Sequence, residues 1–530
     1  MKRTLTCLCL LLALCLAGPA GATAQAQLPA ELAMRIEAAR TPFITPADAA
    51  KVALVEARLT PDAANEADLR IADILAQNTD LVRDTQTPRT VTAAEALTDA
   101  AFLFDYLRCG YAGYGQMGGD AAFLPVLGQV EADIRAFSGE LTPEAFEALL
   151  VRRLQAVIRD SHFTLGDTNF ASSVSETIYY SNDTLFFDAQ ADGGFVTQLE
   201  GRAWRLVSVN GGDPKAMLRL TLDPDGRLCY AMGMNTGESE ELPKELTVSY
   251  VLSDGERTQE REATLSINYR SYMGWPAYNR YERDGITILE NRSLYPQDEA
   301  EKEALARFTQ DALSLSREDV IILDIRGNSG GSDEYPSNWV RNFTRLAYQP
   351  WNHVFASTLD TRTSNLVRLL GLVQGYDLRD EEALRSCLET GFASMLRMQM
   401  GTLSGWTPVE YEPVVERIPS DPWVFVLIDQ GVASSGETFV NLLSRMENVV
   451  FVGSGTCGMY TVANNRTVAL PASGLSLYCG DTLFLPPDLQ DIEGRGFVPD
   501  IWVTPDGSDT IIERIVKFVD RYGLRGGAAR

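Results

Sequence analysis

The sequence predicts an α/β core that follows an α-helical region and a small β-rich module. Apolar residues recur at helical spacing in 94–107 and 146–158, which predicts a helical domain over residues 27–168. Short β-like runs separated by Asn-Gly and Asp-Gly turns predict the β-rich module over residues 169–275. Strands and helices alternate over residues 276–510, and this alternation favours a parallel sheet.

Two buried strands, Val320–Asp324 and Val424–Ile428, define the predicted core, and each leads into a turn that carries serine and glycine. Helical and tryptophan-bearing sequence over about 335–415 interrupts the alternation, so we expect an inserted helical subdomain or lid there. Residues 511–530 predict a C-terminal helix with a glycine-rich tail.

The N-terminal residues 1–26 have the pattern of a secretory signal peptide. A basic start, Met1-Lys2-Arg3, precedes an apolar stretch and small residues suited to cleavage. The apolar stretch is shorter than the ~20 residues that a bilayer-spanning helix needs, which disfavours the alternative of an uncleaved anchor. We therefore expect an exported protein without an integral membrane span, secreted, periplasmic or associated with the cell surface.

Charge and composition exclude several classes of partner. Asp and Glu number 72 against 46 Lys and Arg, for a net charge of −26, which disfavours binding to nucleic acid and anionic lipid. No Cys-x-x-Cys or His/Cys cluster occurs, so no metal site is predicted, and no organic cofactor is implied. Cys457 and Cys479 flank a predicted hairpin and either form a disulfide or remain two buried thiols.

The chain has only two histidines, His162 and His353, so a histidine-assisted mechanism can be built in very few ways. His162 follows the predicted helices in the segment Asp160-Ser161-His162. Serines follow both buried strands of the core, Ser329 after the first and Ser434 after the second. A serine hydroxyl becomes a nucleophile when an adjacent base takes its proton.

Ser329 lies in Gly327-Asn-Ser-Gly-Gly331, which satisfies the Gly-x-Ser-x-Gly pattern. An α/β-hydrolase would need its histidine well after that serine, and His353 is too near to meet this order. A chymotrypsin-like enzyme also carries Gly-x-Ser-Gly-Gly, but on an all-β fold that the α/β alternation excludes. Neither of these two enzyme classes therefore accounts for Ser329, and Ser434 is the other candidate nucleophile.

Four motifs occur in order along the core. They are Asp324-Ile-Arg326-Gly-Asn328-Ser-Gly330-Gly331, Val432-Ala433-Ser434-Ser435-Gly436-Glu437, Val452-Gly453-Ser-Gly-Thr456-Cys-Gly458 and Glu493-Gly494-Arg495-Gly496-Phe497-Val498-Pro499-Asp500. The series resembles the tail-specific, C-terminal processing peptidase and tricorn protease superfamily of serine peptidases, peptidase family S41. The resemblance covers roughly residues 280–510 and implies a ClpP/crotonase-like α/β core that hydrolyses peptide bonds.

The resemblance implies that Ser434 is the nucleophile. The N–H groups of Gly330, Gly331 and Ser435 would then hold the oxyanion of the tetrahedral intermediate. Glu437 opens the following helix, where a carboxylate suits the positive end of the helix dipole, and we expect it to act as a cap.

One departure from the family indicates the branch. Ser-Lys members carry a lysine directly after the glycine that matches Gly458, but Met459 stands there and cannot accept a proton. The tricorn-like branch instead uses a serine–histidine pair from the helical region and a glutamate near the end of the core. Ser161, His162 and Glu493 match those positions.

Structural roles remain alternatives for these residues. His162 could be a satisfied histidine beside a helix end, and Glu493 could cap its own loop. Asp324 and Arg326 stand at a strand end, where we expect a structural ion pair rather than a catalytic role.

The sequence therefore predicts a secreted serine endopeptidase that acts on peptides or proteins through an acyl-enzyme on Ser434, activated by His162. Two alternatives stay open: a catalytically inactive protein that binds a peptide or apolar ligand on the same scaffold, and an esterase. The stretch Leu206–Pro214 resembles part of a PDZ domain, and PDZ domains bind a chain terminus by adding it as a strand to their sheet edge.

Overall fold

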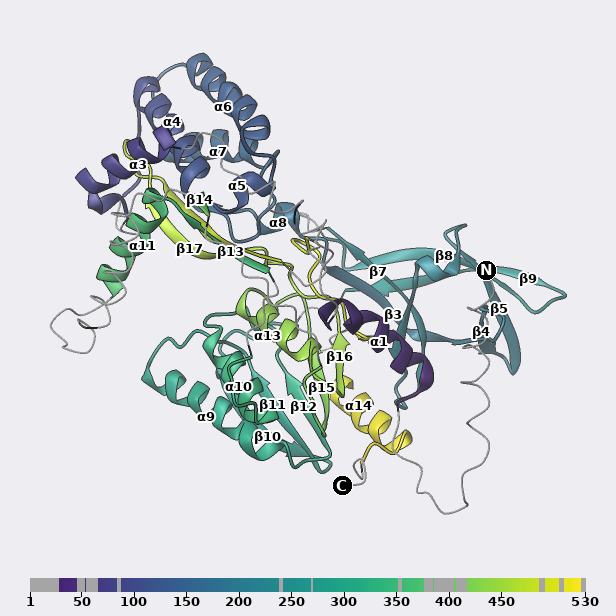
Figure 1. Cartoon of the computed structure of the whole chain (residues 1–530). Helices are drawn as coiled ribbons and strands as arrows, with labels where there is room; N and C mark the ends of the chain where they lie inside the picture. The colour runs from purple at the N-terminus through teal and green to yellow at the C-terminus, as the bar shows by residue number, and fades with distance from the viewer. Residues whose placement is uncertain are drawn as a thin grey trace, which may run out of the picture.

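Three hydrophobic cores organise the part of the chain that the structure describes. Figure 1 shows how its helices and strands are arranged. The computed structural model describes residues 28–44, 53, 65–82, 87–237, 242–267, 270–350, 355–375, 385, 405–406, 417–485, 491–504 and 510–525. The predicted signal peptide lies outside these residues. Among the helices that are described, none is both long and apolar enough to cross a bilayer.

A six-stranded sheet forms the predicted α/β core. Its strand order is β10 (Tyr278–Arg283), β11 (Ile286–Asn291), β12 (Val320–Asp324), β15 (Trp423–Ile428), β16 (Val449–Gly453) and β19 (Ile501–Trp502). β11 through β19 pair in parallel, and β10 joins the edge in antiparallel pairing. Every residue of β12 and β16 is buried, as expected for parallel strands covered on both faces. The α/β prediction for this region is confirmed.

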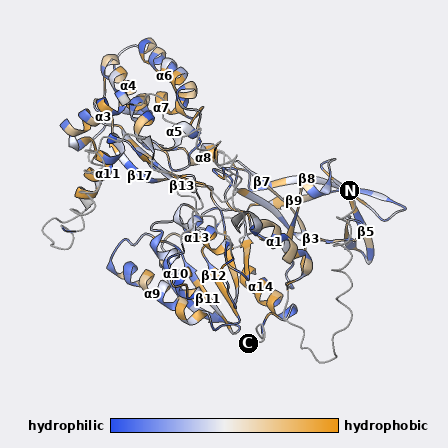
Figure 2. Cartoon of the chain, in the orientation of Figure 1, coloured by the Kyte–Doolittle hydropathy of each residue, from blue (hydrophilic) through white to orange (hydrophobic). Residues whose placement is uncertain are grey.

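Helices and a second sheet cover the two faces of this core sheet. One face packs against α9 (Glu299–Leu315), α10 (Glu334–Thr344) and α13 (Ser435–Ser444) through a core that includes Phe308, Trp339 and Phe439. The other face shares a core with α1 (Ala30–Ile44), α14 (Thr510–Arg521) and the β-rich module. In Figure 2 the strands between these layers are coloured hydrophobic, which matches their burial.

The β-rich module is a seven-stranded antiparallel sheet, which confirms its predicted β character. Its order is β4 (Phe195–Leu199), β5 (Arg202–Val209), β8 (Glu245–Ser253), β9 (Thr258–Ser266), β3 (Ile178–Ala189), β7 (Leu228–Thr236) and β6 (Leu218–Leu222). Between β3 and β9, the only helical residues among those described form a short 3-10 helix, η2 (Pro214–Ala216). The likeness to a PDZ domain stays a prediction.

The predicted N-terminal α-helical region is also confirmed, apart from α1, which shares a core with the β-rich module. It comprises α3 (Asn65–Gln77), η1 (Thr79–Val82), α4 (Ala93–Gly110), α5 (Gly113–Gln116), α6 (Gly119–Ala136) and α7 (Pro143–Leu154). A capping box between Thr92 and Glu95 starts α4, and Thr142 with Pro143 starts α7. These helices share one core with the hairpin of β17 (Val462–Ala469) and β18 (Ser476–Leu485).

The described residues of the expected helical insert over about 335–415 include strands as well as helices. α10 packs against α9 and α13 of the core, and α11 (Arg362–Gly375) follows β13 (Phe355–Asp360). β13 pairs with β18 and with β14 (Gly405–Trp406), in the sheet that also contains β1 (Thr164–Leu165) and β2 (Thr168–Asn169). A short strand of this kind depends on a partner more than 100 residues away, so local sequence does not predict it.

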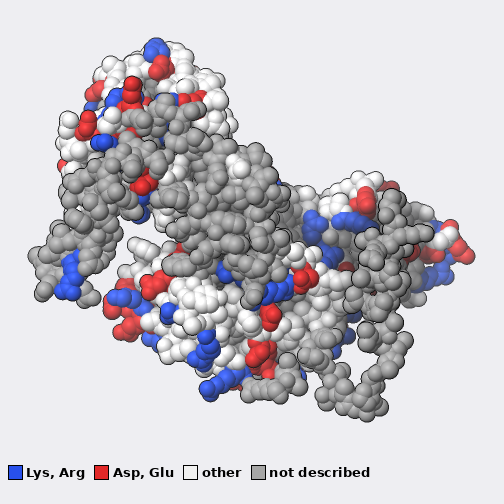
Figure 3. Space-filling view, viewed as in Figure 1, with Lys and Arg blue, Asp and Glu red and all other residues white. Residues whose placement is uncertain are grey.

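The structure places both cysteines of the predicted hairpin. Cys457 lies before β17 and Cys479 lies within β18, and the two are not joined by a disulfide. In the view of Figure 3, acidic and basic side chains of the described residues are interspersed over the core and the helical domain.

Candidate active site

Ser434 occupies a strained turn between β15 and α13. Its backbone has φ 51° and ψ −124°, a conformation that a non-glycine residue adopts only when its surroundings enforce it. The Ser434 N–H donates to the carbonyl of Met459 at 3.0 Å, and the Ala433 N–H donates to the carbonyl of Asn328 at 3.0 Å. Two neighbouring loops therefore hold the turn, and the serine stands half-buried at its apex.

The glycine turn after β12 lies directly against Ser434. A Cβ on Gly330 would lie 2.9 Å from Ser434 Cβ and 2.8 Å from the Ala433 carbonyl oxygen, so only glycine fits at this approach. Ser435 Oγ donates to the Gly331 carbonyl at 2.9 Å, which joins the two turns.

The three predicted oxyanion donors differ in availability. The Gly330 N–H already donates to Asn328 Oδ1 at 3.0 Å. Within the described part of the chain, the N–H groups of Gly331 and Ser435 have no acceptor in the protein. The turn therefore offers two free donors beside Ser434, whereas Gly330 allows the glycine turn to lie close to Ser434.

The segment that carries Ser161 and His162 follows α7 and contacts the core. The Ser161 N–H donates to Glu493 Oε1 at 2.7 Å, and Ser161 Oγ donates to the Gly458 carbonyl at 3.3 Å. Glu493 Oε2 accepts from the Thr461 N–H at 2.9 Å. The structure thus brings Ser161 and Glu493 together, next to the loop that holds Ser434.

His162 is buried, with 8% of its surface exposed, and its Nδ1 has no hydrogen-bond partner in the protein. Burial lowers the pKa of His162 to about 4, so the imidazole is neutral at pH 7 and able to accept a proton. Among the hydrogen bonds of the described residues, none joins this ring to Ser434.

Asp160 is a buried neighbour to which the sequence reasoning gave no role. Its Oδ1 accepts from the His162 N–H at 2.8 Å, and its Oδ2 accepts from Tyr111 Oη at 2.8 Å. Burial, together with the nearby Glu493 carboxylate, raises the pKa of Asp160 well above its usual range. Its position beside the Ser-His pair was the signal that could have singled it out.

Glu437 requires a correction, because it does not cap its own helix. Its carboxylate instead accepts hydrogen bonds from Thr456 Oγ1, from the Gly458 N–H at 2.8 Å and from the Met459 N–H at 2.7 Å. The side chain is fully buried, and burial raises its pKa to about 7. Buried hydrogen-bond donors need an acceptor, and Glu437 supplies one to the donors of this loop. The side chain therefore serves the loop and not the start of its own helix.

The predicted ion pair of Asp324 and Arg326 is confirmed and contains a third member. Arg326 donates to both carboxylate oxygens at 2.8 and 2.6 Å, and Arg292 does the same at 2.8 and 2.7 Å. Asp324 is fully buried, and the two guanidinium groups hold its pKa well below the usual range against the effect of burial. This cluster fixes the end of β12, where the glycine turn begins.

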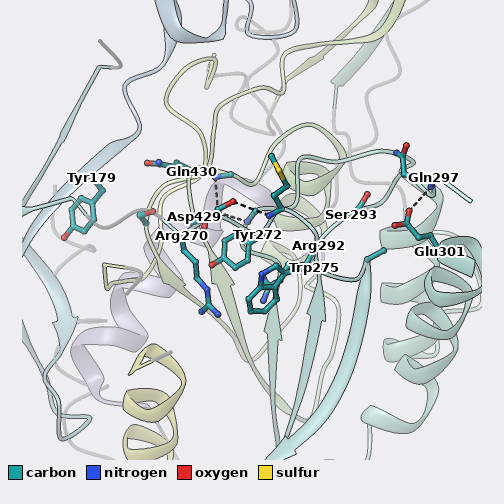
Figure 4. Close-up of a pocket in the computed structure, with 16 residues that line it drawn as sticks. Tyr179, Arg270, Tyr272, Trp275, Arg292, Ser293, Gln297, Glu301, Asp429 and Gln430 are labelled. Carbon is teal, nitrogen blue, oxygen red and sulfur yellow. Dashed lines mark hydrogen bonds between the residues drawn. The ribbon is translucent and has the colours of Figure 1, made fainter. Parts of the chain in front are cut away.

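A cavity of about 440 Å³ lies beyond the carboxyl ends of β12 and β15 (Figure 4). Arg270 and Arg292 stack on its aromatic side chains, with guanidinium-to-ring distances of 4.7 Å to Trp275 and 4.4 Å to Tyr272. Gly327 and Gly431 also line it, but Ser434 and His162 do not. Sequence reasoning missed this cavity, although arginines and aromatic residues alternate over residues 269–281.

Residues 293–503, which contain Ser434 and Glu493, match the model of a peptidase family. By class the chain is a serine-type peptidase, a hydrolase. The matching family is Peptidase family S41, and the chain carries a domain of that family over these residues.

Comparison with solved structures finds distant similarity. Mature CPAF is 13% identical and covers 81% of this chain and 96% of its own, with a TM-score of 0.42. The photosystem II D1 C-terminal processing protease is 14% identical over 81% of this chain and 98% of its own, with a TM-score of 0.36. The tricorn protease is 12% identical over 81% of this chain and 37% of its own, with a TM-score of 0.36. No curated protein matches the chain.

Proposed function

We propose that this chain is a secreted serine endopeptidase that forms an acyl-enzyme on Ser434 with His162 as the base. The observation that carries the proposal is the strained Ser434 turn, which lies beside two N–H groups without acceptors, those of Gly331 and Ser435. Strain of this kind persists where the surrounding structure holds a functional residue in place. Paired free N–H groups beside a nucleophile suit a developing oxyanion.

The reaction would proceed by acyl transfer. His162 takes the Ser434 Oγ proton as the oxygen attacks the peptide carbonyl, and the carbonyl oxygen becomes an oxyanion held by Gly331 and Ser435. His162 then gives that proton to the leaving amine, which departs as the acyl-enzyme forms. Water, deprotonated by His162, releases the acyl group and returns the proton to Ser434.

The choice of the Ser-His branch is part of the proposal. Met459 offers no side-chain base, whereas burial keeps His162 neutral at pH 7. Ser161 and Glu493 support the proposal as positioning residues, because their hydrogen bonds tie the histidine segment to the loop that holds Ser434.

Export is the second part of the proposal and rests on the basic and apolar pattern of residues 1–26. The substrate would then be a peptide or protein met outside the cytoplasm, in the periplasm, at the cell surface or in the medium. N-terminal sequencing of the exported protein should find a start just after the Ala22–Ala26 region. A mature protein that begins at Met1 would contradict export by cleavage.

A fluorophosphonate probe, which phosphonylates activated serines, tests the catalytic assignment. The purified mature protein is compared with Ser434→Ala and His162→Ala, with Ser329→Ala as the matched control. We expect wild type and Ser329→Ala to label equally and the other two to lose labelling, with all folds intact by circular dichroism. Labelling that survives Ser434→Ala but not Ser329→Ala would overturn the assignment.

One observation favours a second candidate, a catalytically inactive binding protein. His162 Nδ1 is buried without a partner, and its ring has no hydrogen bond to Ser434 among the described residues. A folded wild-type protein that does not label at all would support this candidate. Side-by-side hydrolysis of peptide and ester substrates separates the endopeptidase from an esterase.

A further inference from the structure

We propose that Glu437 is a positioning residue, which fixes the proposed nucleophile Ser434 by holding the loop Thr456–Met459 in place. The inference rests on the proposed function of Ser434 and extends it to a side chain that contacts neither substrate nor reacting atoms. Glu437 lies three residues after Ser434, in the first turn of α13.

Glu437 binds the loop Thr456–Met459 directly. Its two carboxylate oxygens accept from Thr456 Oγ1 and from the N–H groups of Gly458 and Met459, at 2.8 and 2.7 Å for the two amides. Charged acceptors form shorter and stronger hydrogen bonds than neutral ones. Thr456 Oγ1 in turn accepts from the Phe497 N–H at 2.7 Å. This bond connects the loop held by Glu437 to the motif Glu493–Asp500.

The same loop contacts Ser434. The Met459 carbonyl accepts from the Ser434 N–H at 3.0 Å, and the Cys457 N–H donates to the Val432 carbonyl at 2.8 Å. The Met459 N–H held by Glu437 and the Met459 carbonyl that holds Ser434 belong to adjacent peptide units of one residue, so only the φ and ψ of Met459 separate the two hydrogen bonds. The φ of 51° at Ser434 depends on such constraints.

The same loop also contacts the segment that carries Ser161 and His162. The Gly458 carbonyl accepts from Ser161 Oγ at 3.3 Å and from the Gly494 N–H at 2.8 Å. Glu437 therefore holds the N–H of Gly458 while the histidine segment holds its carbonyl. A shift of this loop would separate Ser434 from Ser161 and His162, and misplacement of about 1 Å can cost ~10²-fold in rate.

The main test uses Glu437→Gln, which keeps the size of the side chain but replaces one acceptor oxygen by an NH2 group that faces a loop donor. The matched control is Asp99→Asn. Asp99 is also fully buried and also holds two loop N–H groups, of Ala472 and Ser473 at 2.7 Å each, outside the site. Labelling by the fluorophosphonate probe is followed with time at several probe concentrations, which separates the maximal rate from the half-saturating concentration.

We expect Glu437→Gln to lower the maximal labelling rate by roughly 10- to 100-fold with little change in half-saturation, and Asp99→Asn to label as wild type does. The pH profile adds a readout that a purely structural role would not move. Wild-type labelling should fall as pH drops through about 7, because the protonated carboxyl loses an acceptor, and Glu437→Gln should lack this limb. Tyr460 and Glu493 are the titratable groups that face Glu437.

A second pair of variants keeps the test decisive if Glu437→Gln does not fold. Thr456→Val removes the hydroxyl that donates to Glu437, whereas Thr456→Ser retains it. Slow labelling of the valine variant with recovery in the serine variant supports the inference. Wild-type rates and pH profiles in Glu437→Gln or in Thr456→Val, with Ser434→Ala unlabelled, overturn it. Full labelling of Ser434→Ala refutes the proposed function itself.

Discussion

The backbone carbonyl of Met459 accepts a 3.0 Å hydrogen bond from the backbone N–H of Ser434. Position 459 therefore lies beside the proposed nucleophile, where the Ser-Lys branch of the resembling superfamily carries its base. Here the methionine side chain cannot take a proton. In the proposed mechanism the base comes from another segment, that of His162, whose neighbour Ser161 contacts this loop.

This relationship predicts a partial exchange of bases. Adding Met459→Lys to His162→Ala should restore probe labelling at least ~10-fold above His162→Ala alone, because a lysine at this position can supply a neutral amine. Recovery should grow toward pH 9, since an ordinary lysine has a pKa near ~10.4. Met459→Leu in the same background is the control. Equal labelling of the lysine and leucine variants would count against a base at position 459.

Gly330 should be intolerant of even one added methyl group. Gly330→Ala places a Cβ 2.8 Å from two atoms of the Ser434 turn at a φ of 102°, so we expect loss of probe labelling and lower stability. Gly139→Ala is a matched control, because Gly139 has a φ of 100° with nothing within 4 Å of the added atom. Urea unfolding and labelling of both variants separate backbone strain from the clash. Similar behaviour of the two would show that the contact with Ser434 is unimportant.

Burial of His162 predicts a specific dependence of stability on pH. Its folded-state pKa of about 4 lies below the ordinary 6.5, so between these values the unfolded chain binds a proton that the folded chain does not. This contribution to stability is complete above pH 6.5 and is lost as the pH falls toward 4, by about 3 kcal/mol at most. His162→Gln should flatten the fall in urea-unfolding free energy between pH 7 and 4.5. An unchanged slope would contradict the burial effect.

The Asp324 cluster should be sensitive to the loss of its charge. Asp324→Asn removes the carboxylate that Arg292 and Arg326 share and leaves Glu290 as the carboxylate beside Arg292, so we expect a loss of about 3–5 kcal/mol in unfolding free energy. Asp133 offers the matched control, because it also lies between two arginines, Arg152 and Arg153, but at the surface. Asp133→Asn should leave the urea midpoint almost unchanged. Equal effects of both changes would show that burial does not matter here.

The sequence predicts those parts of the fold that depend on local pattern. β12 and β16 are buried at every position, so their apolar runs are unambiguous, and α7 begins at a clear Thr142-Pro143 cap. β13 could not be found in the same way, because its partner β18 lies far along the chain. Its place in the sheet comes from tertiary pairing, which overrides local preference.

Some residues of the candidate site could likewise be identified from local sequence, and others could not. Ser434 and Gly330 lie in short motifs after buried strands, and these motifs can be recognised in the sequence, whereas the positive φ of each residue is seen only in the structure. The roles of Asp160 and Glu437 depend on burial and on hydrogen-bond partners from other segments, such as Tyr111 for Asp160. A carboxylate in a sequence does not reveal which distant amides will need it as an acceptor.

The bond between the Ser161 N–H and Glu493 Oε1 joins residues that are 332 positions apart. During synthesis the helical domain is complete long before residue 493 leaves the ribosome. The Ser161 N–H therefore lacks its acceptor, Glu493, until nearly the whole chain has been made. A chain still being translated therefore cannot yet join the segment of Ser161 and His162 to the end of the α/β core through this bond.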